Sequence, residues 1–373
     1  MLSRFLVTRH AVRLRPLCLS SVHQMDLKEV VSNLESWAPT SLAEKWDNVG
    51  LLVEPSGQHN VRSILLTNDL TEKVLQEAIE KRANMIISYH PPIFVPLKRL
   101  TSKSFKERII VKAIEERIAI YSPHTAFDAV FGGVNDWLAK GLGRGSVDPI
   151  TYSMEACVKG CDYNVTAIAP STEAAEKINS QINSLGGIGS NSIGKTERFG
   201  DPALPKIVTL CSGDTLSAVM QILQSYTIYY LEIYPLAKKP IPGTGSGRLC
   251  TLDTPVTLPD IIHRIKKHLQ LSHLRVAYAP SKAKDTLLST VALCAGSGAS
   301  VLQGVAADVY LTGEMSHHEV LEAVSRGVHV ILCEHSNTER GFLVPFRQQL
   351  YNMLSGQVQV MVSETDADPL LVV

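Results

Sequence analysis

Short apolar runs alternate with amphipathic stretches along the chain from Met25 onward, a pattern typical of strands that alternate with helices. Strand–helix–strand units of this kind form parallel sheets. In the N-terminal part the pattern predicts helices at Leu27–Trp37, Thr71–Arg82 and Phe105–Arg117. It predicts buried strands at Arg62–Asn68, Met85–Ser88 and Ile118–Tyr121.

The C-terminal part repeats this plan. Apolar runs predict strands at Thr290–Ala295, Val309–Thr312 and Val328–Cys333. Helices are predicted at Ser300–Ala306 and His318–Arg326, and a further helix after the last strand is expected to carry Glu339. The two halves are therefore predicted to be related α/β modules with an internal pseudo-repeat.

Between the halves the pattern changes to strand–helix–strand–strand–helix–strand, which is the ferredoxin-like plan. The strands are predicted at Tyr163–Ala169, Glu197–Phe199, Lys206–Cys211 and Tyr229–Leu236. The helices are predicted at Ser171–Leu185 and Asp214–Ser225. The expected fold class is therefore α/β: two related α/β modules form one domain, which is interrupted by a small α+β ferredoxin-like insert.

The expected boundaries are 26–155 for the N-terminal module, 156–245 for the insert and 246–373 for the C-terminal module. Residues 1–25 form a leader or a disordered tail and lie outside the fold. They carry Arg4, Arg9, Arg13 and Arg15 but no acid, which is typical of a mitochondrial transit peptide. A tail, or a leader upstream of a second start at Met25, is the alternative.

Composition narrows the class of protein. Basic and acidic residues number 36 each among 373 residues, so the formal net charge is zero. Nucleic-acid binders usually carry a basic surplus, so direct nucleic-acid binding is not expected. No apolar run approaches the roughly 20 residues that span a bilayer, so no membrane partner is expected. The seven cysteines are scattered without a CxxC pair, which favours reduced thiols over a zinc ribbon.

Histidines and acids gather where predicted strands end. His90 follows one strand, His124 and Asp128 follow the next, and His335 and Glu339 follow the last. Ligands bind at the carboxyl edge of open α/β sheets. Imidazole with carboxylate suits zinc, manganese, iron or cobalt, and a bridging carboxylate suits a two-metal hydrolytic centre. Capping and core residues are the plain alternative, but three strand ends with this chemistry favour a metal site.

Two further residues lie near another predicted strand end in the C-terminal module. His318 is expected to orient a metal ligand, with Glu314 as its neighbour. The alternative is that His318 is an exposed residue at the start of a helix.

Two glycine-rich stretches have sequences similar to those of anion-binding loops. Residues 189–196 match the GxxxxGK[ST] pattern of phosphate-binding loops. Such a loop needs a strand before it and a helix after it. Here a helix precedes it, so a hairpin-like loop is predicted instead. Gly296–Ala299 lies between a strand and a helix, a better context for an anion, although glycine there also permits a tight turn.

Together, several motifs resemble the NIF3-like family, and the resemblance runs from Asp26 to the C-terminus. They are Trp46–Leu51 (WDNVGL), Ser88–Phe94 (SYHPPIF), Ser122–Thr125 with Asp128, Thr312–Met315 with His318, and Glu334–Glu339 (EHSNTE). The resemblance implies a metal centre with one or two divalent ions per chain (zinc, manganese, iron or cobalt) and His90, Asp128, His335 and Glu339 as ligands. It also implies a homo-oligomer, either a dimer or a higher ring.

One residue departs from the family pattern. Bacterial members usually have His-His-Pro at the first motif, with both histidines on metal, whereas this chain has Tyr89 before His90. The ordinary pKa of a phenol is about 10, so it binds a metal less readily than imidazole at neutral pH. Tyr89 is therefore expected beside the ligands rather than among them, with one metal held weakly or lost.

Two functions remain open. The resemblance implies an oligomeric transcriptional co-regulator, a co-repressor in cytoplasm and nucleus that acts through partners such as a signalosome subunit or a transcriptional regulator. The alternative location is the mitochondrion. The alternative function is a metal-dependent hydrolase of a small phosphate-bearing or nucleotide-like substrate, since some bacterial members carry a GTP cyclohydrolase label. In that enzyme His124 is the predicted catalytic proton shuttle, because imidazole exchanges protons near neutral pH.

Overall fold

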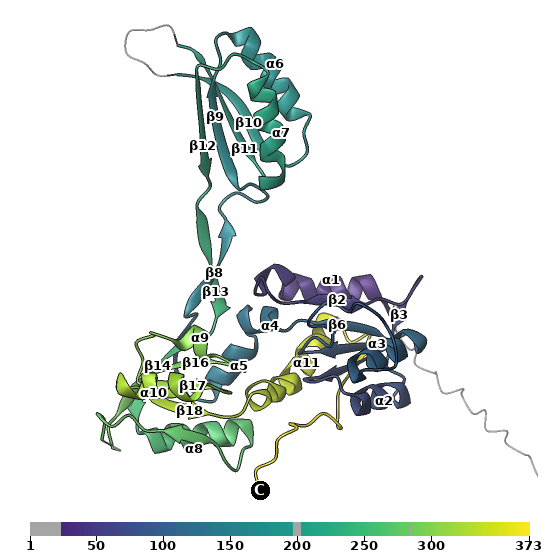
Figure 1. The fold of residues 1–373 in the computed structure, drawn as a ribbon, viewed down its shortest axis with the longest axis vertical. Helices are drawn as coiled ribbons and strands as arrows, with labels where there is room; N and C mark the ends of the chain where they lie inside the picture. The colour runs from purple at the N-terminus through teal and green to yellow at the C-terminus, as the bar shows by residue number, and fades with distance from the viewer. Residues whose placement is uncertain (1–23, 197–202, 284) are drawn as a thin grey trace, which may run out of the picture. The chain divides into compact units, whose positions relative to one another are not determined.

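The computed structural model describes residues 24–196, 203–283 and 285–373 (Figure 1). These residues form two compact units. The first runs to His124 and also includes Arg340–Leu371, and the second is Thr125–Glu339. Most of the predicted leader lies outside the described residues, so its role and the localisation stay predictions. Among the described residues no helix is long and apolar enough to cross a membrane.

The first unit is built on a five-stranded sheet in the order β19-β4-β5-β6-β2. The strands are β2 Gly50–Val53, β4 Ser63–Thr67, β5 Met85–Ser88, β6 Ala119–Ser122 and β19 Gln359–Val362. Only β2 runs antiparallel to its neighbour. The helices are α1 Leu27–Trp37, α2 Glu72–Glu80, α3 Phe105–Glu115 and α11 Leu343–Met353, and a short pair joins β1 Met25–Asp26 to β3 Asn60–Val61.

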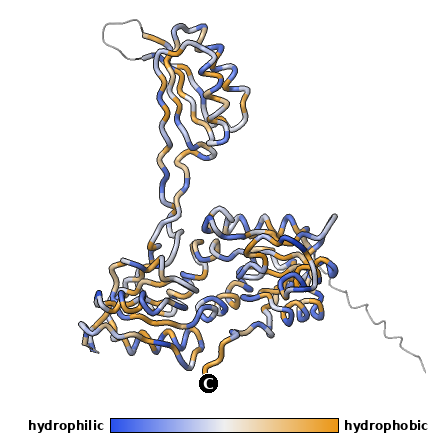
Figure 2. Tube along the Cα trace, viewed as in Figure 1, coloured by the Kyte–Doolittle hydropathy of each residue, from blue (hydrophilic) through white to orange (hydrophobic). Residues whose placement is uncertain are grey.

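Local chemistry explains these elements. Every residue of β4, β5 and β6 is buried, as expected for parallel strands that are covered on both faces. Helices α1, α2 and α3 each begin at a capping side chain, which accepts a hydrogen bond from a backbone N–H of the first turn. The caps are Asp26, Thr71 and Ser104. Figure 2 shows apolar residues along the strands and mixed hydropathy along the helices. The predicted N-terminal helices and strands are confirmed to within two residues at each end.

The last strand changes the expected division of the chain. The C-terminal module was predicted to span 246–373, but β19 pairs in parallel with β4, and residues 340–371 cluster with the first unit. The reason is that β19 completes the apolar sheet of the first unit, a long-range pairing that no local pattern encodes. The predicted boundaries of the insert stay predictions.

The second unit contains a six-stranded sheet in the order β15-β18-β17-β16-β14-β7. The strands are β7 Gly145–Asp148, β14 Arg248–Val256, β15 Arg275–Ala277, β16 Leu288–Cys294, β17 Val309–Thr312 and β18 His329–Leu332. The helices are α4 Thr125–Ala129, α5 Val134–Lys140, α8 Leu258–Leu269, α9 Ala299–Leu302 and α10 His317–Ser325. Strands β16, β17 and β18 are parallel, like β4, β5 and β6, so the two modules are related as predicted.

The segment inserted in the second unit is reached through an antiparallel ribbon of β8 Thr151–Ala156 and β13 Lys238–Ser246 (Figure 1). Its sheet has the order β10-β11-β9-β12 with antiparallel pairs throughout. The elements are β9 Tyr163–Ile168, α6 Thr172–Asn183, β10 Ile188–Lys195, β11 Pro205–Cys211, α7 Gly213–Gln224 and β12 Tyr230–Pro235. This order of elements is the ferredoxin-like one.

One predicted strand of the insert, Glu197–Phe199, lies wholly outside the described residues. Within the described residues the second strand is β10, which contains residues 189–195 of the glycine-rich stretch that was predicted to be a loop. The reason is composition: β10 pairs only with β11 and is mostly polar and exposed, so it lacks a strong apolar pattern. Because Gly194 and Lys195 lie in a strand, no phosphate-binding loop forms there.

The segment that carries Glu339 also differs from the prediction. A helix was expected after His335, but a single 3-10 turn, Ser336–Thr338, ends at Glu339. Asn337 Nδ2 donates to the carbonyl of Cys333 at 2.9 Å, and Thr338 Oγ1 donates to that of His335 at 2.7 Å. Such side-chain bonds to the backbone compete with the helical hydrogen-bond ladder. The turn nevertheless brings Glu339 to His335.

Candidate metal centre

His90 is held in a fixed orientation by an acid from the neighbouring strand. It lies two residues beyond β5, and Asp69 lies two residues beyond β4, the parallel neighbour. His90 Nδ1 is 2.9 Å from Asp69 Oδ1. Asn68 Nδ2 donates to the other oxygen of this carboxylate, Asp69 Oδ2, at 3.3 Å. The side chain of His90 is therefore anchored at Nδ1, which leaves Nε2 as the atom for a ligand role.

The charge state of Asp69 supports this orientation. Burial alone would raise the pKa of this carboxyl, but the hydrogen bond with His90 and the charge of Arg340 outweigh burial, so the pKa lies below its ordinary value of 3.8. An ionised carboxylate only accepts hydrogen bonds. His90 therefore donates through Nδ1–H, which is the arrangement that typically orients a metal-binding histidine and makes its Nε2 more basic.

His124 forms a second acid–histidine pair in the first unit. It follows β6, and its Nδ1 lies 2.7 Å from Oδ1 of Asp47, whose side chain is fully buried. Its φ of +33° is unusual for an L-residue and is typical of positions that the surrounding structure constrains for function. The ring of His90 lies edge-on to that of His124, with centroids 5.3 Å apart. Nε2 of His124 is the atom left to exchange a proton.

Aromatic side chains surround this pair. Tyr89 is only 2% exposed, and its ring meets those of His90 and His124 edge-on at 5.1 and 5.6 Å. Trp46 and Phe94 also meet the His124 ring edge-on, at 5.9 and 6.4 Å. Tyr89 therefore packs beside the histidines, and whether it influences a metal stays a prediction.

The second unit contains an acid–histidine pair of its own. His335 Nδ1 lies 2.8 Å from Glu314 Oε1, and its Nε2 lies 3.3 Å from Glu339 Oε1. Glu339 is 3% exposed. Glu314 thus holds Nδ1 of His335, while Nε2 and the Glu339 carboxylate face each other. An imidazole nitrogen and a carboxylate oxygen at this separation are donors that suit zinc, manganese, iron or cobalt.

The two units contain the same arrangement of an acid and a histidine at neighbouring strand ends. Glu314 lies two residues beyond β17, as Asp69 lies two residues beyond β4. His335 follows β18, the parallel neighbour of β17, as His90 follows β5. In each unit, therefore, an acid at one strand end holds Nδ1 of a histidine at the next.

The glycines at Gly296–Ala299 serve close packing rather than anion binding. Gly296 has a φ of +63°, and a Cβ there would lie 2.5 Å from Glu339 Oε1 and 3.0 Å from His335 Nε2. The amide N–H of Gly296 donates to Thr338 Oγ1 at 2.8 Å, and that of Gly298 donates to Thr312 Oγ1 at 3.0 Å. Because these two amides already donate within the protein, the tight-turn alternative describes Gly296 and Gly298 better than an anion cradle does.

Other predicted residues are placed differently. Asp128 lies in α4 of the second unit and is partly buried, and its role as a metal ligand stays a prediction. His318 is exposed in the first turn of α10, where its ring contacts that of His317. The surface alternative therefore describes its position better than contact with a ligand.

Sequence reasoning assigned no role to Asp69 and Asp47. Asp47 lies in the WDNVGL motif, and Asp69 stands after its strand as Glu314 does. The pseudo-repeat was thus the signal that could have found Asp69.

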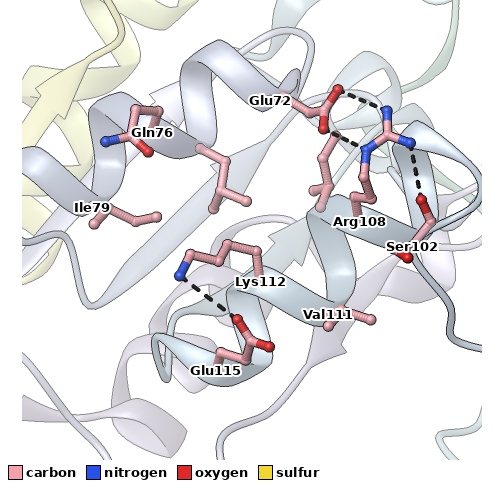
Figure 3. A pocket seen from close by; sticks show the side chains of 10 residues that line it. Glu72, Gln76, Ile79, Ser102, Arg108, Val111, Lys112 and Glu115 are labelled. Carbon is pink, nitrogen blue, oxygen red and sulfur yellow. Dashed lines mark hydrogen bonds and ion pairs between the residues drawn. The ribbon is translucent and has the colours of Figure 1, made fainter.

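A separate pocket lies between α2 and α3 of the first unit, with a volume of about 350 Å³ (Figure 3). Its charged residues pair with one another: Arg108 Nε lies 2.8 Å from Glu72 Oε1, and Lys112 Nζ lies 3.7 Å from Glu115 Oε2. None of its lining residues is a candidate ligand, so it is not part of the candidate metal centre.

Comparison with known proteins places the chain. The family model described as Duf34/NIF3 (NGG1p interacting factor 3) matches residues 25–369. The chain is 47% identical to NIF3-like protein 1 of Rattus norvegicus over the full length of both. It is 48% identical to NIF3-like protein 1 of Homo sapiens, over 96% of this chain and 95% of that protein. NGG1-interacting factor 3 of Saccharomyces cerevisiae is 31% identical over 94% of this chain and 99% of that protein.

Two solved structures have a fold similar to that of this chain. Staphylococcus aureus protein SA1388 matches with a TM-score of 0.72 and 26% identity, over 94% of this chain and 99% of that chain. A Bacillus cereus protein related to NIF3 matches with a TM-score of 0.66 and 26% identity, over 94% of this chain and 100% of that chain. The family model covers almost the whole chain, and the full-length relatives carry the same family name. The chain therefore belongs to the NIF3 family.

Proposed function

We propose, from the family resemblance and from the donor chemistry of each side chain, that His90, His335 and Glu339 are ligands of a divalent metal ion. The observation that carries the proposal is the repeated pairing of an acid with the Nδ1 of a histidine, His90 with Asp69 and His335 with Glu314. This pairing leaves both Nε2 atoms as donors. Asp128 as a further ligand, and a second ion, remain part of the proposal on the resemblance alone.

The chemistry that this site supports best is metal-dependent hydrolysis of a small substrate. A divalent ion polarises a phosphoryl or carbonyl oxygen and lowers the pKa of water. His124 supplies the proton acceptor: Asp47 holds Nδ1, so Nε2 takes a proton from the attacking water and returns it to the leaving group. The phosphate-bearing or nucleotide-like character of the substrate is proposed from the resemblance.

Metal content tests the proposal directly. The purified protein is expected to contain at least one zinc, manganese, iron or cobalt ion per chain by elemental analysis. His335→Ala is expected to lose most of that metal, because it removes one donor and leaves Glu339 without its neighbouring imidazole.

His273→Ala is the matched control, since it removes an exposed histidine of the same unit and should leave the metal content unchanged. A metal-free native protein, or equal metal in both variants, would rule out the proposed centre.

A second candidate function is protein binding in transcriptional control. The specific observation is the name of the yeast relative, NGG1-interacting factor 3, at 31% identity over nearly the full chain. We propose that the chain acts, as an oligomer, as a co-regulator that binds a transcriptional regulator or a signalosome subunit.

Binding to purified NGG1p, measured by surface plasmon resonance, tests this second function. The wild type and His335→Ala are expected to bind with equal affinity, because protein recognition does not require the metal donors. A complete lack of binding by the wild type would count against the co-regulator role for this partner, and loss only in His335→Ala would show that recognition depends on the metal centre.

A further inference from the structure

The acid that orients His90 is itself held by a residue from the far end of the chain. Arg340 Nη2 donates to Asp69 Oδ2 at 3.3 Å. The same guanidinium donates to both oxygens of Asp366, from Nε to Oδ2 at 3.2 Å and from Nη2 to Oδ1 at 3.3 Å. All four residues lie in the first unit. A continuous chain of hydrogen bonds therefore runs from Asp366 through Arg340 and Asp69 to His90.

Asp366 is fixed independently of Arg340. Its side chain is 3% exposed, and Asp366 Oδ2 accepts the backbone N–H of Asn68 at 2.8 Å. Asn68 immediately precedes Asp69. Asp366 therefore binds the backbone next to Asp69, and it also binds Arg340, which contacts the Asp69 carboxylate.

The segment that carries Asp366 has its own anchor on α2. The carboxylate of Glu77, which is 6% exposed, accepts hydrogen bonds from Ser363 Oγ at 2.6 Å and from Thr365 Oγ1 at 2.7 Å. It also accepts the backbone N–H of Glu364 at 2.9 Å. Residues 363–366 are therefore held at two places, one on Glu77 and one at Arg340.

We infer that Arg340 and Asp366 are positioning residues for His90, so the C-terminal segment is a working part of the candidate metal centre. This inference rests on the proposed metal-binding function. Asp69 is 37% exposed, so water competes for its oxygens and for its contact with His90. Two donors hold Oδ2, the guanidinium of Arg340 and the side-chain amide of Asn68, both at 3.3 Å, which leaves Oδ1 aimed at Nδ1 of His90. Of these two donors only the guanidinium is charged, and a charged donor forms the stronger hydrogen bond.

The geometry of arginine is central to this role. A guanidinium is planar and presents its donors in a fixed fork, so it can hold two carboxylates at one set angle. The lysine ammonium is a point charge on a flexible stem and cannot reproduce that angle. Arg340→Lys thus keeps the charge and removes the alignment.

Zinc affinity, measured by competition with a chromophoric chelator, tests the inference. Arg340→Lys and Asp366→Asn are each expected to weaken zinc binding by about 10-fold, the lower end of the range for residues that orient metal ligands. Thr365→Ala is the matched control, because it removes one bond of the same segment to Glu77 but none to Asp69. Equal affinity in all variants, or an equal loss in Thr365→Ala, would overturn the inference.

A second measurement needs no metal and separates this inference from the proposed function. In metal-free protein above the titration range of histidine, the ¹⁵N chemical shifts of the His90 ring report which nitrogen carries the proton. The wild type is expected to show Nδ1–H, and Arg340→Lys a mixture of both tautomers. An unchanged tautomer in Arg340→Lys would overturn the positioning role, whereas a wild type that shows Nδ1–H but binds no zinc would overturn the proposed metal function alone.

Discussion

His124→Ala is expected to lower the rate of metal-dependent hydrolysis by about 10²–10⁴, the usual contribution of a positioned general acid or base. The measurement is the turnover of bis(4-nitrophenyl) phosphate by the metal-loaded protein. Metal content should stay at the wild-type level, because His124 is not among the proposed ligands. The variant thus separates proton transfer from metal binding.

The physical reason lies in the buried carboxylate behind the imidazole. Asp47 Oδ1 lies 2.7 Å from Nδ1 and its side chain is fully buried, so it fixes the tautomer and keeps Nε2 as the acceptor. Asp47→Asn is therefore expected to slow the same reaction, because an amide can donate to Nδ1 and favour the opposite tautomer.

His59→Ala is a suitable control for both variants. It removes another histidine of the first unit, one that is bonded to the carbonyl of Asn84 at 2.9 Å, and should leave turnover unchanged. Wild-type turnover that survives in His124→Ala would exclude this residue as the proton shuttle. Absence of any metal-dependent turnover by the wild type would contradict the hydrolase proposal itself.

Arg248→Ala is expected to destabilise the second unit by about 3–5 kcal/mol, the usual cost of breaking a buried ion pair by removing one partner. The Arg248 side chain is 0% exposed, and its Nε lies 2.8 Å from Asp136 Oδ1. Because domains of this size are stable by only about 5–15 kcal/mol, such a loss would consume a large part of the stability. Denaturant unfolding of the purified variant and the wild type measures it.

Arg248 joins two segments that are far apart in sequence, residues 129–136 and 243–248. Its Nη1 donates to the carbonyls of Gly245 and Gly247, both at 2.7 Å, and its Nη2 donates to those of Ala129 and Val130, both at 3.3 Å. Without the guanidinium, these buried carbonyls and Asp136 each lose a charged donor at once, which explains the size of the expected effect. Asp136 then keeps the backbone N–H of Gly132, and the Val130 carbonyl keeps that of Gly133.

Arg264→Ala is the matched control. Its Nη1 donates to the carbonyl of Leu142 at 2.6 Å in a partly buried setting, so its loss should cost about 1.5 kcal/mol, the lower end for a hydrogen bond with a charged group. Equal destabilisation by the two variants would show that the buried network of Arg248 has no special weight.

Local patterns predicted most elements because capping and apolar periodicity act over a few residues. Strands β5 and β17 match their predicted ranges without change, since each is a short, fully buried apolar run. Prediction failed where the local signal was weak or misleading. Strand β10 is polar and exposed, and the run after His335 bonds its side chains to its own backbone, so a turn replaces the helix.

The candidate ligands were also readable from sequence, because a histidine at the end of a buried strand must emerge at the carboxyl edge of the sheet. Their partners were not readable in the same way. Asp69 is 21 residues from His90, and Asp47 is 77 residues from His124. Only the parallel alignment of neighbouring strands and the fold of the connecting loops bring these side chains together.

The sequence by itself thus determined the alternation of strands and helices, the family, and the histidines and acids that bear the chemistry. The tertiary structure alone decided that the last strand joins the sheet of the first unit. It also decided that Arg340 contacts Asp69 and Asp366, and that Gly296 must lack a side chain beside Glu339. The reason is physical: periodicity and capping are local, whereas strand pairing and the aim of a side chain are settled by burial among segments hundreds of residues apart.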